Sequence, residues 1–134
     1  MTGPEAPPRA DGFVLDLPAD AAFVASARVF AAGVARRAGC DETQVDDVKL
    51  AVSEAWAAIA GAGPSGSVRL EIAPEGDRLR FELRSAGPRS AAEPPDRPWP
   101  GGIELVRALF EDAEVLDEGP ARTARFSVPL RPSA

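Results

Sequence analysis

The residue of this chain with the clearest chemical potential is Glu54. It lies in a stretch whose apolar residues recur at the three- and four-residue spacings of an amphipathic helix: Val45, Val48, Val52, Ala55 and Ile59. Because Glu54 falls off that apolar stripe, its carboxylate is free to act as a general base. One turn later, at the i+4 position where a second polar group would join it around a ligand, the residue is Ala58. The helix therefore carries a candidate base without its neighbour.

The composition leaves a carboxylate as the only candidate base. The 134 residues include no histidine and no tyrosine, which removes the usual general base, a common metal ligand and every histidine-dependent triad. Cys40 is the single cysteine, so neither an intramolecular disulfide nor a thiolate metal cluster can form within the chain. Next to a helix start, its thiol is expected to be inert, and we predict no metal-ligating residues.

The charge points to a protein partner. A net charge of −6 disfavours direct binding to nucleic acid, which requires a basic surface. The sequence shows no apolar run long enough for a membrane helix and no signal-peptide start, so we expect a cytoplasmic protein without membrane association.

The elements that position Glu54 follow from periodicity and from breaking residues. Asp20 is the expected N-cap of a first helix that ends near Gly39. Asp41 and Gln44 resemble a capping box that opens the helix of Glu54, which ends near Gly61. A third helix is expected to open at 101–102 and to bury its apolar residues as far as Phe110. Strands are expected at 13–17, 68–72, 79–84, 114–116 and 123–130, with a hairpin turn at 74–77.

This order of elements predicts an α/β (α+β) two-layer sandwich. Its mostly antiparallel mixed sheet would have about five strands, covered on one face by three helices. Residues 1–12 are rich in proline and glycine and are expected to form a disordered tail, which leaves 13–134 as a single domain. Five prolines in 87–100 exclude regular structure there, so that segment is expected to be a surface loop or lid.

With these elements placed, residues 13–130 resemble the GHKL (Bergerat, or histidine kinase-like ATPase) fold, specifically its RsbW-like anti-sigma factor serine-protein kinases. In that family the second helix carries L-x-V-x-E-x-x-x-N-A, where the glutamate acts as base and the asparagine coordinates magnesium. Leu50, Val52 and Glu54 match this motif, but Ala58 replaces the asparagine. The resemblance thus implies that Glu54 is a remnant of a catalytic residue.

The glycine motifs of the family also match only in part. The D-x-G-x-G motif, whose aspartate accepts from the adenine amino group, falls on 85–89, where Ser85 replaces the acid, Gly87 is kept and Arg89 replaces the second glycine. The phosphate-binding G-x-G motif falls on 100–103 and keeps Gly101 and Gly102.

Thr123 is the candidate for a threonine that the family has near the start of its last strand. The resemblance therefore implies a cofactor site with the following residues: Ser85, Gly87, Gly101, Gly102 and Thr123. Because of the departures at 58, 85 and 89, ATP and magnesium are predicted to bind weakly or not at all.

The resemblance also implies protein partners. Arg28 falls where the family has a surface arginine that contacts the sigma factor and the anti-anti-sigma factor, a STAS-type protein, so it is the predicted partner-binding residue. Members of the family commonly form homodimers, and a homodimer is expected here on that ground.

Three functions remain open on the sequence. The first is an anti-sigma factor or related partner-switching transcription regulator that sequesters a sigma factor by protein–protein binding, with nucleotide binding weakened or lost. The second is an active ATP-dependent serine kinase that phosphorylates an anti-anti-sigma factor with Glu54 as base. The third is a domain whose site is reused for another small ligand, with the proline-rich segment shaping a new pocket.

Overall fold

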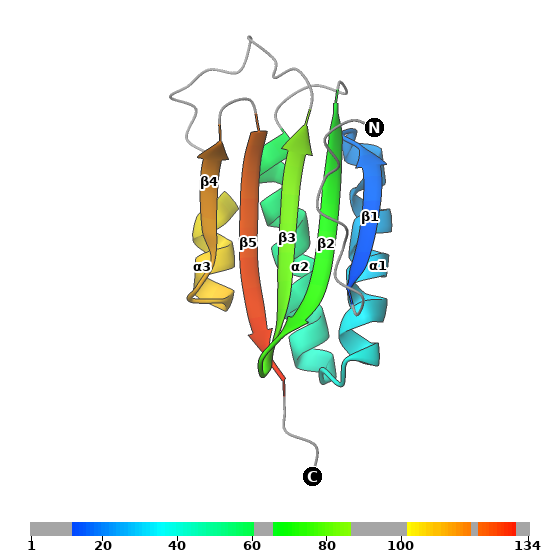
Figure 1. The fold of residues 1–134 in the computed structure, drawn as a ribbon, viewed down its shortest axis with the longest axis vertical. Coiled ribbons are helices and arrows are strands. Elements are labelled where there is room, and N and C mark those ends of the chain that lie inside the picture. The colour runs from blue at the N-terminus through cyan, green and yellow to red at the C-terminus, as the bar shows by residue number, and fades with distance from the viewer. Residues whose placement is uncertain (1–11, 61–65, 87–101, 119–120, 131–134) are drawn as a thin grey trace, which may run out of the picture.

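The computed structural model of the chain describes residues 12–60, 66–86, 102–118 and 121–130 (Figure 1). Three helices lie on one face of a five-stranded sheet. The helices are α1 (Val24–Arg37), which follows a short 3-10 turn at Ala21–Phe23, then α2 (Glu42–Ala60) and α3 (Gly102–Leu109). The strands are β1 (Phe13–Pro18), β2 (Ser67–Glu75), β3 (Arg78–Ala86), β4 (Glu114–Glu118) and β5 (Ala121–Pro129).

The predicted fold class is confirmed, and the sheet is more regular than predicted. Its strand order is β1-β2-β3-β5-β4, and the pairs along this order are all antiparallel, so the described sheet is antiparallel rather than mixed. The chain passes from β3 through α3 to the edge strand β4, and β5 then returns between them (Figure 1). This crossover brings the inner face of β5 against α2.

The helix ends form where the local signals predict them. The side chain of Asp20 accepts a hydrogen bond from the amide of Ala22 at 2.9 Å, although it caps the 3-10 turn before α1. Asp41 and Gln44 form the reciprocal capping box, with hydrogen bonds of 2.8 and 3.0 Å. Gly39 ends α1 with a φ of +98°, a conformation that glycine adopts without strain.

The core lies between the sheet and the helices. Alternation on β3 places Leu79, Phe81 and Leu83 on the inner face, where they are buried. Phe126 of β5 stacks between Phe81 and Phe110, with ring centroids 4.9 Å apart on both sides. Small residues fill the α1–α2 contact and let the two helices approach closely: Ala27, Ala31, Ala51 and Ala55. Trp56 is buried in this core.

None of the helices in the described part of the chain has the length and apolar character that a membrane span requires. The predicted tail, apart from residue 12, and the predicted lid lie outside the described residues.

Candidate functional site

Helix α2 holds Glu54 half-buried, on the flank of its buried stripe. The stripe packs against the sheet, while α1 and α3 pack against the two sides of α2. Ala58, one turn after Glu54, is also half-buried and offers no side-chain oxygen to a cation. The helix therefore presents one carboxylate where a magnesium nucleotide would require two polar groups.

Ser85 lies near the end of β3 on the same inner face and is only 9% exposed. Its hydroxyl is engaged by β5, because Oγ accepts a hydrogen bond from the amide of Arg122 at 3.0 Å and donates its one proton to the carbonyl of Arg122 at 3.2 Å. The side chain predicted to meet adenine instead extends the pairing between β3 and β5.

The side chain of Arg122 reaches from β5 to α2. Its Nη1 donates to the carbonyl oxygen of Ala58 at 3.0 Å, and its Nε donates to Oδ1 of Asp117 on β4 at 2.9 Å. The last turn of a helix leaves carbonyls without partners and carries a partial negative charge, and α2 has no basic residue of its own there. Arg122 thus supplies a cation to the end of α2.

Arg122 connects two of the positions that depart from the family motifs, Ala58 through its side chain and Ser85 through its backbone. The sequence interpretation did not single out Arg122, although a signal existed. The apolar residues 124, 126, 128 and 130 alternate along the last strand and so share one face, and the same alternation extended by one step puts residue 122 on that face.

Of the other predicted cofactor residues, the structure describes Thr123 and the helical position of Gly102. Thr123 is buried but follows Arg122 on β5, so it lies on the opposite face of the sheet, in register with Arg84 and Leu116. Gly102 begins α3, and the first turn of that helix carries Glu104, an exposed carboxylate where a phosphate would need positive potential. Gly87, Gly101 and Arg89 lie outside the described residues.

Taken together, the described side chains fit magnesium and ATP poorly. Position 58 lacks a ligand atom, the hydroxyl of Ser85 is engaged, and Glu104 adds negative charge at the start of α3. Across the described ranges, His, Cys, Asp and Glu side chains form no group of three that would hold a metal ion. Burial raises the pKa of the Cys40 thiol, and the charge of Asp41 raises it further, which disfavours a reactive thiolate.

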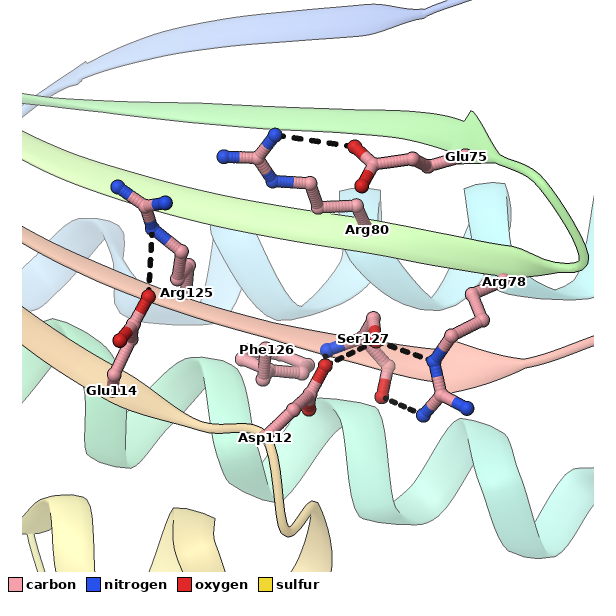
Figure 2. A pocket seen from close by; sticks show the side chains of 8 residues that line it. All are labelled: Glu75, Arg78, Arg80, Asp112, Glu114, Arg125, Phe126 and Ser127. Atoms are coloured by element: carbon pink, nitrogen blue, oxygen red, sulfur yellow. Dashed lines mark hydrogen bonds and ion pairs between the residues drawn. The ribbon is translucent and has the colours of Figure 1, made fainter.

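A separate hollow of about 280 Å³ lies on the outer face of the sheet, away from the helices (Figure 2). Within it, Asp112 accepts hydrogen bonds from the amide and the hydroxyl of Ser127, and Arg78 donates to the same hydroxyl at 2.6 Å. The residues that line the hollow are Glu75, Arg78, Arg80, Asp112, Glu114, Arg125, Phe126 and Ser127.

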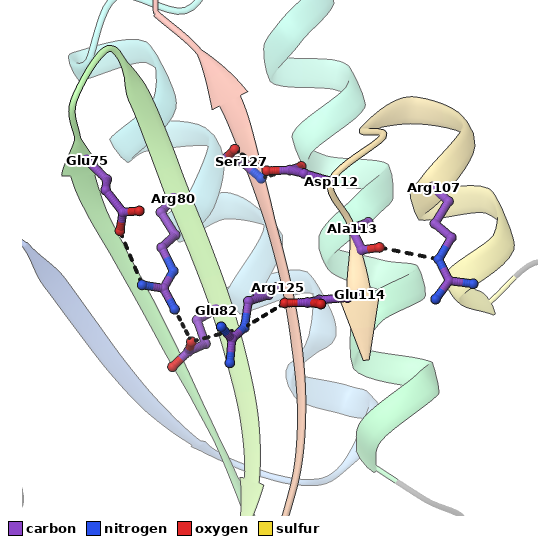
Figure 3. Close-up of polar contacts among 9 residues, drawn as sticks. All are labelled: Glu75, Arg80, Glu82, Arg107, Asp112, Ala113, Glu114, Arg125 and Ser127. Carbon is purple, nitrogen blue, oxygen red and sulfur yellow. Dashed lines mark hydrogen bonds and ion pairs between the residues drawn. The ribbon is translucent and has the colours of Figure 1, made fainter. Parts of the chain in front are cut away.

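The charges of this outer face pair with one another in a row across four strands (Figure 3). Arg80 bonds Glu75 at 3.2 Å and Glu82 at 2.7 Å, and Arg125 lies 3.7 Å from Glu82 and 3.5 Å from Glu114. Burial acts to lower the pKa of Arg80, but the charges and hydrogen bonds of Glu82 and Glu75 outweigh it and raise that pKa. Since the cations face carboxylates within the molecule, this hollow has little net charge for a ligand.

Arg28 lies on the solvent side of α1, where its Nη1 approaches the hydroxyl of Ser53 on α2 at 3.5 Å. The helices around it carry exposed apolar side chains, because Val29 of α1 is 73% exposed and Leu50 of α2 is 43% exposed. The structure therefore places the predicted partner-binding residue on a helix layer that combines an arginine with exposed aliphatic groups.

Comparison with known proteins identifies similar sequences. The model of the histidine kinase-like ATPase domain matches residues 17–126. The serine-protein kinase RsbW of Bacillus thuringiensis (strain Al Hakam) is 31% identical over 124 residues, which covers 78% of this chain and 78% of the relative. The protein of the same name from Bacillus cereus (strain AH187) is 32% identical with the same coverage.

Solved structures share the fold. A structure of the RsbU and RsbW domains of a Mycobacterium tuberculosis protein aligns with a TM-score of 0.70 and 19% identity, covering 91% of this chain. This chain spans only 33% of that longer one. The catalytic domain of the histidine kinase ThkA aligns with a TM-score of 0.51 and 14% identity over 90% of this chain and 99% of its own length.

Proposed function

This chain belongs to the histidine kinase-like ATPase domain family, and we propose that it is an anti-sigma factor of the partner-switching type that sequesters a sigma factor by direct binding. Its curated relatives carry the name serine-protein kinase RsbW. The resemblance to RsbW-like anti-sigma factors implies exchange between a sigma factor and an anti-anti-sigma protein. In this proposal the chain keeps the exchange of partners and has weakened or lost the nucleotide.

The observation that carries the proposal is the contact between Arg122 and the carbonyl of Ala58, beside Ser85. A lost charge-assisted hydrogen bond to adenine weakens binding by roughly 1.5–3 kcal/mol, which is about one to two decades in affinity. The missing ligand at position 58 weakens magnesium coordination in addition. Binding to a partner does not require either group.

The helix layer supports a protein interface. Arginine is enriched in the cores of interfaces, and exposed aliphatic groups such as Val29 and Leu50 gain free energy when a partner covers them. We propose that Arg28 lies within this interface and that a sigma factor and a STAS-type anti-anti-sigma protein compete for it. A homodimer is part of the same proposal, by analogy with the family.

The test is capture of purified sigma factors and STAS-type proteins from the source organism by the full chain, without nucleotide. We expect one of each to bind, and Arg28→Glu to weaken that binding at least about tenfold. Arg37→Glu is the matched control, because Arg37 is also exposed on α1. Capture of neither protein class would refute the proposal, and equal effects of the two variants would remove Arg28 from the interface.

The alternative function is an active serine kinase. Two observations favour it: the relatives are named as kinases, and Glu54 is retained on α2 in a half-buried position. Transfer of labelled phosphate from ATP to a captured STAS-type protein would establish it, provided that Glu54→Gln abolishes the transfer. The absence of transfer at millimolar ATP and magnesium favours the first function.

A further inference from the structure

Arg122 is held at its position by three independent attachments. Its backbone amide and carbonyl both bond the hydroxyl of Ser85, its Nε bonds Asp117 at 2.9 Å, and its Nη1 bonds the carbonyl of Ala58 at 3.0 Å. The side chain is only 27% exposed. An arginine anchored at the backbone and at two separate guanidinium nitrogens has little freedom to leave.

The surroundings favour the cation at this place. The carbonyl end of α2 carries the negative end of the helix dipole, and the carboxylate of Asp117 faces the guanidinium from β4. A guanidinium with several N–H donors serves both acceptors at once, which the single ammonium of a lysine does less well. The arrangement therefore links the last turn of α2 to the β4–β5 pair.

We propose that the side chain of Arg122 occupies part of the space in which a nucleotide would bind. Its side chain fills the space between the last turn of α2 and the end of β3, and it fixes the end of α2 as a bound ligand would. The inference rests on the proposed function in one respect, since it assigns positions 58 and 85 to a former nucleotide site. Its consequence is a domain that keeps its partner-binding form without ATP.

The test compares two substitutions that remove the guanidinium but differ in volume. Arg122→Thr opens the space and keeps a residue that suits a strand, whereas Arg122→Met keeps most of the volume without charge. Arg125→Ala is the matched control, because Arg125 lies on the same strand and also faces a carboxylate of β4, but on the outer face. The probe is ADP without magnesium, measured by calorimetry.

We expect the wild type, Arg122→Met and Arg125→Ala to bind ADP with dissociation constants above about 1 mM, and Arg122→Thr to bind at least about tenfold more tightly than the wild type. A role in stability alone predicts that the Thr and Met variants do not differ in ADP binding. Absence of a gain in Arg122→Thr would overturn this inference and leave the proposed function standing. Tight binding of ADP by the wild type would overturn both.

A second readout follows the end of α2. Both Arg122 variants should lower the melting temperature by about 4–8 °C and speed amide hydrogen exchange in the last turn of α2, because that turn loses its link to β4 and β5. Arg125→Ala should leave that exchange unchanged. If Arg122→Thr does not fold, Arg122→Ala takes its place in the ADP measurement: tighter binding than in Arg122→Met supports the inference, and equal binding overturns it.

Discussion

The two faces of β5 each carry an arginine that faces a carboxylate of β4, yet the two arginines do different things. Arg122, on the inner face, bonds Asp117 and also the end of a helix. Arg125, on the outer face, lies 3.5 Å from Glu114 and 3.7 Å from Glu82, and its Nε makes no hydrogen bond. The face on which a charge lies, rather than its residue type, decides whether it joins layers or only balances neighbouring charges.

The comparison implies that the inner face carries most of the stability. The inner face is packed with apolar side chains that meet the helices, while the outer face is held by ion pairs at partly exposed positions. Burial of a large side chain stabilises by several times the contribution of a surface ion pair, which is about 0–1 kcal/mol. Substitutions along one strand can test this difference.

The largest effect is expected at Phe126. Replacing it with alanine removes a ring that stacks on both Phe81 and Phe110, which should lower the free energy of unfolding by about 3–5 kcal/mol. Urea unfolding followed by fluorescence of the buried Trp56 measures the change. A loss below about 1 kcal/mol would contradict the assignment of stability to the inner face.

The next largest effect is expected at Asp112, which accepts hydrogen bonds on the outer face of β5. Its carboxylate accepts from the amide of Ser127 at 3.1 Å and from the Ser127 hydroxyl, so Asp112→Ala leaves two donors of a buried residue without their acceptor. We expect a loss of about 1–2 kcal/mol in the same unfolding experiment. Asp112→Asn is the control, because its amide oxygen can still accept one bond. Equal losses in the two variants would show that the hydrogen bonds contribute little.

The smallest change on β5 is expected for Arg125→Ala. Its ion pairs are partly exposed, so the free energy of unfolding should fall by less than about 1 kcal/mol, and the difference should shrink at high salt. Unfolding curves at low and high salt provide the measurement. A large loss that salt does not reduce would mean that the outer face contributes like the inner one.

A last test concerns an exposed ion pair of the helix layer, which should also contribute little to stability. The pKa of Glu42 is lowered, first by its hydrogen bond from Arg36 and then by the charge of Arg36, and both side chains are exposed. A lowered carboxyl pKa stabilises the fold at pH values above the ordinary pKa of glutamate, and this contribution is lost as the pH falls through the lowered value. We therefore expect Glu42→Gln to have a slightly lower melting temperature than the wild type at neutral pH. This difference should vanish in strong acid. Equal losses at both pH values would exclude the ion pair as its cause.

Local features of this fold could be predicted from the sequence because their causes are local. The cap at Asp20, the capping box at Asp41 and the glycine at 39 each act within one helical turn. The capping box and the glycine are found as predicted, while Asp20 caps the 3-10 turn that precedes α1. The alternation of strands gave the inner and outer faces correctly. The strand order was not deduced, because pairing of β5 between β3 and β4 depends on contacts between distant segments.

The candidate site could likewise be predicted only where its causes are local. Position 58 and position 85 were recognised from motifs, but their connection through Arg122 joins residues 64 and 37 positions apart in the chain. Thr123 illustrates the opposite case, since the alternation of 124, 126, 128 and 130 already placed it on the other face, while the family motif assigned it to the cofactor site. A residue that a motif assigns to a site should therefore also lie on the strand face that the periodicity predicts for that site.

The strand order also has a consequence for the synthesis of this protein. Among the described strands the last one made, β5, lies inside the sheet, and β4 has no other strand to pair with. A nascent chain that has emerged only as far as residue 120 therefore exposes an unpaired edge of β3 and an isolated β4, and lacks the phenylalanine that joins Phe81 to Phe110. We expect the domain to fold only after the ribosome has released most of β5, and a fragment that ends at residue 120 to lack the cooperative unfolding transition of the whole chain in circular dichroism.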